Sequence, residues 1–124
     1  MQIYITSVFV DDQDKARTFY TEKLGFIVKQ DQPIGDYSWL TVVSPDQPDG
    51  PELLLEPNVH RAVPGYCQAL FEDGIPAASF KVDNLPEELA RLESQGVEVL
   101  QPMVEMEGVA VANISDTCGN VIQL

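Results

Sequence analysis

The sequence contains the same supersecondary pattern twice, at residues 10–28 and at residues 80–99. In each copy a β-rich run ends in Val-Asp, a stretch with apolar residues at helical spacing follows, and a glycine precedes a second β-rich run. The copies are offset by 72 residues at the Val-Asp pair and by 71 at the glycines, Gly25 and Gly96. This repeat predicts a fold made of two copies of one module.

Each copy carries the signals that begin and end a helix. Asp11 and Asp12 offer an N-cap in the first copy, and Gly25 supplies a left-handed residue after the helix. The helix face expected to be buried consists of Ala16, Phe19, Tyr20 and Leu24 in the first copy and of Leu85, Leu89 and Leu92 in the second. Both stretches are therefore predicted to be amphipathic helices.

The remaining β-rich runs complete the order β-α-β-β-β in both halves. The predicted strands are 2–10, 26–30, 36–44 and 52–56, then 77–82, 97–100 with an extension toward 105, 109–115 and 120–124. Residues 58–74 contain Pro64 and lack strand alternation, so they are predicted to be a linker with one helical turn at 67–71. We expect one α+β domain over residues 1–124, with module 1 at about 1–57 and module 2 at about 75–124.

The net charge limits the kinds of binding partner that are expected, and the cysteine content indicates the cellular compartment. The net charge of −13 disfavours nucleic acids and anionic membranes, and it favours cationic ligands unless it serves solubility alone. The chain has only two cysteines, Cys67 and Cys118, no secretory leader and no long apolar run. We therefore expect a cytoplasmic protein without a disulfide.

Motifs along the whole chain together resemble the vicinal oxygen chelate superfamily, which includes glyoxalases, bleomycin-resistance proteins and extradiol dioxygenases. They are VxDxxxAxxFYxxxLGF at 10–26, a strand ending at Glu56, FKVDNL at 80–85 and DxxGNxIxL at 116–124. The resemblance implies two β-α-β-β-β modules whose sheets form a cup around a ligand. It also implies that a second chain completes the cup, so a homodimer is expected.

In the metal enzymes of this family, ligands lie on the first and last strands of each module. Carried over by the motifs, these positions fall on Ile5, Glu56, Ala77 and Gln123. Neither Ile5 nor Ala77 can bind a metal, and the only histidine, His60, falls in the linker. We therefore expect no metal and no other cofactor, and the sequence identifies no catalytic residue.

The residues expected to line the cup form an apolar pocket with a few polar groups. They are Ile5, Ser7, Leu54, Glu56, Ala77, Ser79 and Gln123, with Trp39 as an aromatic wall. No phosphate-binding loop, paired-cysteine motif or nucleophile motif accompanies them.

Three hypotheses follow. The first is a metal-independent binding protein, resembling the bleomycin-resistance type, that sequesters a small amphipathic molecule. A cationic ligand would give Glu56 a partner in the cup. The second is a glyoxalase-like lyase or dioxygenase whose atypical metal site includes Glu56. The third is a structural or regulatory module whose cup is filled by side chains.

Overall fold

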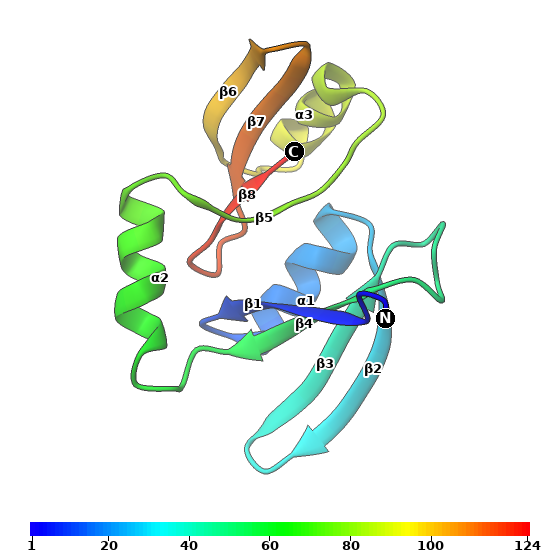
Figure 1. Ribbon diagram of the computed structural model, residues 1–124, viewed down its shortest axis with the longest axis vertical. Helices are drawn as coiled ribbons and strands as arrows, with labels where there is room; N and C mark the ends of the chain where they lie inside the picture. Colours follow the sequence, from blue (N-terminus) through cyan, green and yellow to red (C-terminus); the bar gives the residue numbers. More distant parts are fainter.

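Two four-stranded mixed sheets, one from each half of the chain, form the framework of the structure (Figure 1). A computed structural model describes residues 1–124. The first sheet has the order β1-β4-β3-β2, with β1 (Ile5–Val10), β2 (Ile27–Ile34), β3 (Tyr37–Val43) and β4 (Glu52–Pro57). The second has the order β5-β8-β7-β6, with β5 (Pro76–Ser79), β6 (Val99–Met106), β7 (Val109–Ser115) and β8 (Val121–Gln123). The shared strand order confirms the predicted α+β repeat.

A helix packs against one face of each sheet. In module 1, α1 (Gln13–Thr18) continues into a π-helix, η1 (Phe19–Lys23), so the single helix expected there is two helical types in succession. In module 2, the helix is α3 (Leu85–Ser94). The side chain of Asp12 caps α1 by accepting a hydrogen bond from the Lys15 backbone N at 2.9 Å, which confirms the predicted capping segment.

The predicted glycine stops are confirmed in both modules. Gly25 and Gly96 have φ values of 84° and 81°, in the left-handed region that is costly for residues with a Cβ. The chain therefore turns sharply from each helix into the next strand at the position marked by the repeat.

The hydrophobic core lies between the helices and the faces of the sheets that they cover. The predicted helix faces are confirmed: Ala16, Phe19, Tyr20, Leu85, Leu89 and Leu92 are buried in one core cluster, and Leu24 is partly buried against it. In β1 this cluster takes Val8 and Val10, so the alternate residues point to the opposite face. The cluster is continuous between the modules, and Phe80 of module 2 packs edge-on against Tyr20 with ring centroids 6.4 Å apart.

The prediction of a mostly irregular linker is wrong. Residues Val63–Glu72 form a ten-residue helix, α2, which spans the side of the molecule between the two sheets (Figure 1). Pro64 lies in the first turn of α2, where a proline needs no hydrogen-bond partner for its nitrogen and its φ already suits a helix. The proline that indicated a linker therefore marks a helix start.

Several strand boundaries also differ from the prediction. Strand β1 begins at Ile5 rather than at residue 2, β5 ends at Ser79, and β8 is limited to Val121–Gln123. Strand β2 continues to Ile34 through Pro33, which had indicated a loop. Because β2 is at the edge of its sheet, Pro33 can occupy it without removing a hydrogen bond from a central ladder.

Candidate functional site

We call the face of each sheet opposite its helix, α1 or α3, the cup face. Several of its central side chains, such as Thr41, Leu54 and Asn113, are buried. In module 1 it carries Ile5, Ser7 and Phe9 of β1, Trp39, Thr41 and Val43 of β3, and Glu52, Leu54 and Glu56 of β4. In module 2 it carries Ser79 of β5, Gln101 of β6, Asn113 of β7, and Val121 and Gln123 of β8. Strand register thus places seven of the eight residues predicted to line the cup on these faces, and the eighth, Ala77, lies at the irregularity between Pro76 and Ala78. Their contact with a ligand remains a prediction.

One row of side chains crosses the four strands of each cup face at the same level. In module 1 the row is Ser7, Leu54, Thr41 and Gln30. In module 2 it is Ser79, Gln123, Asn113 and Gln101. The position equivalent to Gln123 in module 1 is thus Leu54, and Glu56 lies two residues further along β4.

Glu52 is a buried carboxylate in module 1 that the sequence analysis did not single out. Its side chain is only 5% exposed, and its Oε1 accepts hydrogen bonds from Thr41 Oγ1 at 2.6 Å and Gln30 Nε2 at 2.7 Å. These bonds, from Thr41 first and then Gln30, lower the pKa of Glu52 although burial opposes them. Glu52 is therefore ionised at neutral pH, and its Oε1 is hydrogen-bonded within its own module.

Glu56 and Trp39 lie where β3 and β4 separate. The side chain of Gln13 fills the opening: its Nε2 donates to the carbonyls of Ser38 and Leu55 at 2.8 and 2.9 Å. Glu56 is half-buried on the cup side, next to Phe9 in the register of β1 and β4, and its carboxylate has no hydrogen bond or ion pair with another side chain. This end of the cup face presents a carboxylate without a side-chain partner beside the aromatic residue Phe9.

The row in module 2 is polar at every position. Ser79 Oγ donates to Gln123 Oε1 at 2.7 Å, and Asn113 Nδ2 donates to Gln101 Oε1 at 3.3 Å. Asn113 is 7% exposed, and its Oδ1 is the one buried side-chain nitrogen or oxygen without a hydrogen-bond partner.

A cavity of about 230 Å³ lies where the two modules meet beside α2. Ser7 and Phe9 of β1 and Ala77 of β5 line it together with apolar residues of α2 such as Leu70. The structure thus brings Ser7 and Ala77 into one cavity, whereas Trp39, Leu54 and Glu56 remain on one module and Ser79 and Gln123 on the other. This volume is below the 300 to 1,000 Å³ typical of pockets for drug-sized ligands.

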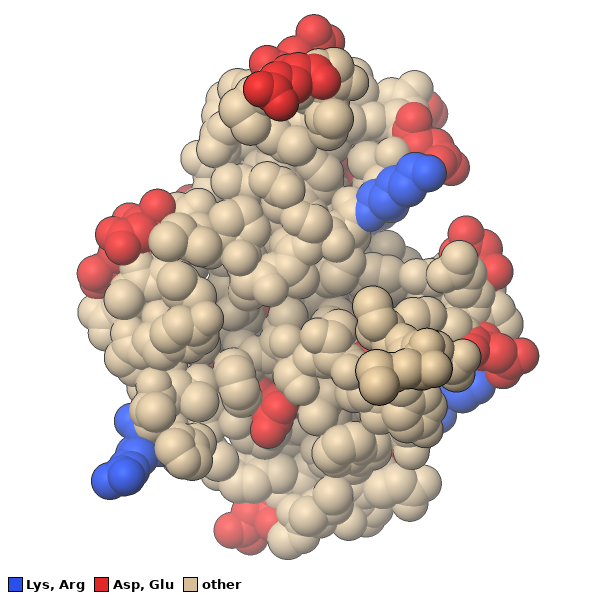
Figure 2. Space-filling view, viewed as in Figure 1, with Lys and Arg blue, Asp and Glu red and all other residues tan.

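A larger hollow of about 940 Å³ opens between the modules near the start of α3, at the right of Figure 2. Its lining is mostly polar and charged, including Asp46, Lys81 and Arg91, and Ser79 is the only predicted site residue that reaches it. We place the candidate site on the cup faces, because the lining of this cleft is predominantly polar and only one of the predicted site residues reaches it.

The cup faces do not fit a divalent metal ion. Nowhere do three His, Cys, Asp or Glu side chains come close enough together to hold one. The only imidazole, that of His60, lies before α2 and accepts a hydrogen bond from the Ala62 backbone N at 3.2 Å. Ile5 and Ala77 occupy the two first-strand positions with apolar groups.

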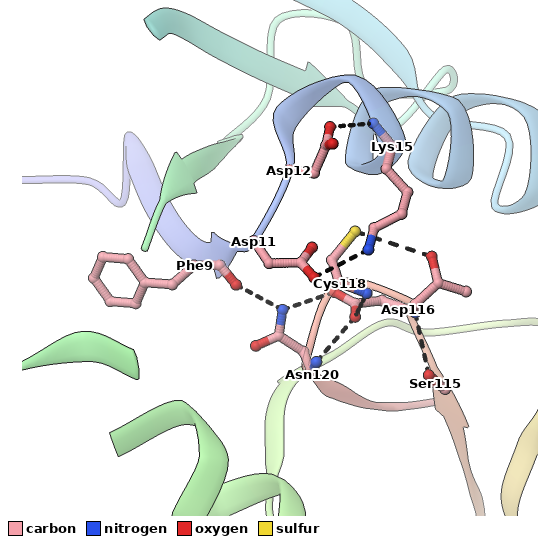
Figure 3. A network of polar contacts seen from close by, with 9 residues as sticks. Phe9, Asp11, Asp12, Lys15, Ser115, Asp116, Cys118 and Asn120 are labelled. Atoms are coloured by element: carbon pink, nitrogen blue, oxygen red, sulfur yellow. Dashed lines mark hydrogen bonds and ion pairs between the residues drawn. The ribbon is translucent and has the colours of Figure 1, made fainter. Parts of the chain in front are cut away.

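The closing motif DxxGN joins the two modules (Figure 3). Asp116 is fully buried and accepts hydrogen bonds from Tyr20 Oη at 2.8 Å and from the backbone nitrogens of Cys118 and Asn120 at 2.7 and 2.9 Å. The Asn120 amide donates both to Asp116 Oδ2 and to the Phe9 carbonyl at the end of β1, each at 2.7 Å. We call this network the module clamp.

Both cysteines are free, and neither is set up as a nucleophile. Cys118 is 2% exposed, and burial, with the charge of Asp116 as the second cause, raises the pKa of its thiol to about 12. Burial also raises the pKa of Cys67. A nucleophilic cysteine needs the opposite shift, toward the thiolate.

The face of the molecule on which the sheets lie in front of the helices carries little charge. Figure 2 shows acidic and basic side chains around its edge and an acidic group near its middle, with uncharged surface between them. For a chain with a net charge of −13, this distribution is uneven. No helix is long and apolar enough to span a membrane.

Comparison with known proteins gives consistent matches over the full chain. The sequence model of the Glyoxalase/Bleomycin resistance protein/Dioxygenase superfamily matches residues 2–124. The uncharacterized protein YurT of Bacillus subtilis (strain 168) is 50% identical, with 100% of this chain and 98% of YurT covered. The crystal structure of UcmS2 superposes with a TM-score of 0.84 at 31% identity, covering 99% of this chain and 96% of that one. TnmS3, an antibiotic binding protein from Streptomyces sp. CB03234, superposes with a TM-score of 0.76 at 28% identity, covering 99% and 93%.

Proposed function

This chain belongs to the Glyoxalase/Bleomycin resistance protein/Dioxygenase superfamily, and we propose that it sequesters a small amphipathic molecule on its cup faces without a metal ion. The observation that carries this proposal is the carboxylate of Glu56, which has no side-chain partner and lies beside Phe9 on the cup face. The similarity to TnmS3, whose described role is antibiotic binding, supports small-molecule binding as the activity.

We propose that the ligand carries a positive charge. A cation beside Glu56 would pair with a half-buried carboxylate that has no partner within the chain. Phe9 and Trp39, both half-buried on the same face, offer aromatic rings for the apolar part of the ligand and a cation-π contact for its charge. Glu52 suits this role less well, because it is buried and its Oε1 already accepts hydrogen bonds from Thr41 and Gln30.

Titration calorimetry with matched dyes tests this proposal. Proflavine is a planar aromatic cation, and acridone is a neutral compound with the same three-ring skeleton. We expect wild type to prefer proflavine, and Glu56→Gln to weaken proflavine binding at least tenfold, about 1.4 kcal/mol, without changing acridone binding. Glu93→Gln, at an exposed position on α3, should change proflavine binding by less than twofold.

Equal losses in Glu56→Gln and Glu93→Gln would contradict the role of Glu56. Binding of acridone alone would contradict a cationic ligand. The absence of binding of any aromatic probe would contradict small-molecule sequestration.

We further propose that the protein is a cytoplasmic homodimer in which a second copy covers the cup faces. Tyr37 of β3 is 46% exposed and Ala77 is exposed on these weakly charged faces, which suits contact with another apolar surface. Both cysteines are unpaired, as expected in a reducing compartment.

Light scattering tests the dimer and should give twice the monomer mass of 13.7 kDa. Ala77→Glu should lower the measured mass to that of the monomer, whereas Gln68→Glu on α2 should leave it unchanged. A monomer for wild type at every concentration would contradict the dimer.

A further inference from the structure

We propose that the row Ser79, Gln123, Asn113 and Gln101 on the cup face of module 2 binds an amide-type edge of the ligand, meaning an adjacent N–H donor and C=O acceptor. This inference rests on the proposed small-molecule binding and adds the class of polar group that the ligand carries. It concerns module 2, whereas the cationic group was assigned to Glu56 on module 1.

The first observation is the unpaired Oδ1 of Asn113. A buried side-chain acceptor without a donor is unfavourable, and native structures satisfy nearly all such groups with protein, water or ligand. Asn113 is more than nine-tenths buried, in the centre of the row between Gln123 of β8 and Gln101 of β6. A donor from a bound molecule would complete its hydrogen bonding.

The second observation is the equivalent row in module 1. Thr41 and Gln30, which correspond to Asn113 and Gln101, both donate to the carboxylate of Glu52. Module 1 therefore satisfies its row from within. The residue at the position of Glu52 in module 2, two residues before Gln123 on β8, is the apolar Val121, which pairs with Pro76. The second row therefore has no carboxylate of its own module to accept its hydrogen bonds.

The chemistry of the row favours a neutral amide over a charged group. Its side chains are two glutamines, an asparagine and a serine, which supply both donors and acceptors but no charge. An amide edge also matches Asn113 whichever way its carboxamide is turned, because the edge offers a donor for Oδ1 and an acceptor for Nδ2. A bare cation would satisfy only the acceptors.

The row can open with little loss. Gln101 is exposed, and its bond from Asn113 is long at 3.3 Å, beyond the usual range for a strong N–H···O hydrogen bond. Movement of the Gln101 side chain would therefore expose the Asn113 carboxamide to a ligand on the cup face.

The test compares 2-naphthamide with N,N-dimethyl-2-naphthamide, which keeps the ring system and the carbonyl but has no N–H. Binding is followed by the side-chain amide signals in ¹⁵N–¹H correlation spectra of the full chain. We expect wild type to bind 2-naphthamide at least fivefold more tightly, and the Asn113 side-chain signals to shift. Asn113→Leu and Gln101→Leu should abolish the preference, and Gln68→Leu on the exposed side of α2 should keep it.

Gln101→Leu keeps the test valid if Asn113→Leu perturbs the fold, because Gln101 is exposed. The inference would be overturned if wild type bound the two naphthamides equally, or if both row variants, Asn113→Leu and Gln101→Leu, kept the preference. If proflavine still bound in that case, the proposed function would stand. Binding of proflavine without binding of either naphthamide would overturn the inference as well. Failure of proflavine, acridone and both naphthamides together would instead overturn the proposed function itself.

Discussion

Modules 1 and 2 share a strand order and a helix position, yet they use the equivalent polar positions on their cup faces differently. In module 1, Thr41 and Gln30 donate hydrogen bonds to Glu52. In module 2, Asn113 at the position of Thr41 keeps an unpaired buried oxygen. One duplicated architecture can thus use the same row of positions for stability in one copy and leave it available for a ligand in the other.

The modules also differ in the loop before the last strand. In module 2 this loop carries the module clamp, in which Asp116 holds Tyr20 and Asn120 reaches the end of β1. In module 1 the residues between β3 and β4, Ser44 to Pro51, form turns and carry Asp46 and Asp49 at exposed positions. Only the loop of module 2 therefore links the two copies.

The largest expected effect comes from removing the clamp. Asp116→Ala leaves the Tyr20 hydroxyl, two backbone nitrogens and the Asn120 amide without their acceptor, and most of these groups are buried. We expect a loss of at least about 3 kcal/mol in the free energy of unfolding. Urea denaturation measures it, with Asp46→Ala in the corresponding loop as the control, expected within about 0.5 kcal/mol of wild type. Similar small losses in both variants would mean that the two loops do not differ in their role.

The next effect compares the two rows directly. Thr41→Val removes one of two hydrogen bonds to the buried Glu52 carboxylate, so we expect a loss of about 2 kcal/mol. Asn113→Leu removes an unsatisfied acceptor and one long hydrogen bond, so we expect unchanged stability or a gain of up to about 1 kcal/mol. The same denaturation experiment decides both. A loss of about 2 kcal/mol in Asn113→Leu would show that the second row is structural like the first.

A smaller effect, dependent on pH, comes from Cys118 in the clamp loop. Its folded pKa of about 12 lies above the value of about 8.5 for an unfolded thiol, so the folded state holds the proton more tightly. This stabilisation is complete below pH 8.5 and falls as the pH rises toward 12. Between pH 8 and pH 9.5 we expect a loss of about 1 kcal/mol, before the tyrosines of the unfolded chain ionise.

Cys118→Ala should flatten most of this decline, and Cys67, whose pKa is also raised, accounts for a remainder present in both proteins. Stability curves at a series of pH values provide the measurement. A decline of the same slope in wild type and Cys118→Ala would place the alkaline sensitivity elsewhere.

The repeat and the strand alternation made the fold and the faces predictable from the sequence. The pattern ELLLE already placed Glu52, Leu54 and Glu56 on one side of β4, and the register agrees. The pairing of Glu52 could not be predicted, because its partner Gln30 is brought level with Thr41 by a register shift between Val28 and Gln30. Alternation indicates a face, whereas contacts across strands depend on such bulges.

The clamp was missed for a related reason. In the sequence, DxxGN is part of the family motif at 116–124, and Tyr20 belongs to the helix face that is expected to be buried. The ring is indeed buried, and its hydroxyl reaches a carboxylate 96 residues away in the sequence. A buried tyrosine usually finds a partner for its hydroxyl, but a sequence pattern does not say which one.

The smallest expected effect is the response to metal ions, and it tests whether the two cup faces together could build a metal site. Glu56 comes from module 1 and Gln123 from module 2, at positions that are not equivalent in the two registers, and the first-strand partners Ile5 and Ala77 have no donor atoms. Because a catalytic zinc site needs about three protein ligands, we expect Zn²⁺, Ni²⁺ and Fe²⁺ to bind more weakly than micromolar in calorimetry and to leave the unfolding temperature unchanged within about 1 °C. His60→Ala serves as a control for weak binding outside the cup faces, since an exposed imidazole alone can hold a transition metal loosely. The contrary outcome is one equivalent of metal bound at micromolar affinity, retained in His60→Ala and lost in Glu56→Ala. It would mean that a rearranged or dimeric cup recruits Glu56 as a ligand. The protein would then have to be considered among the metal-dependent enzymes of its superfamily.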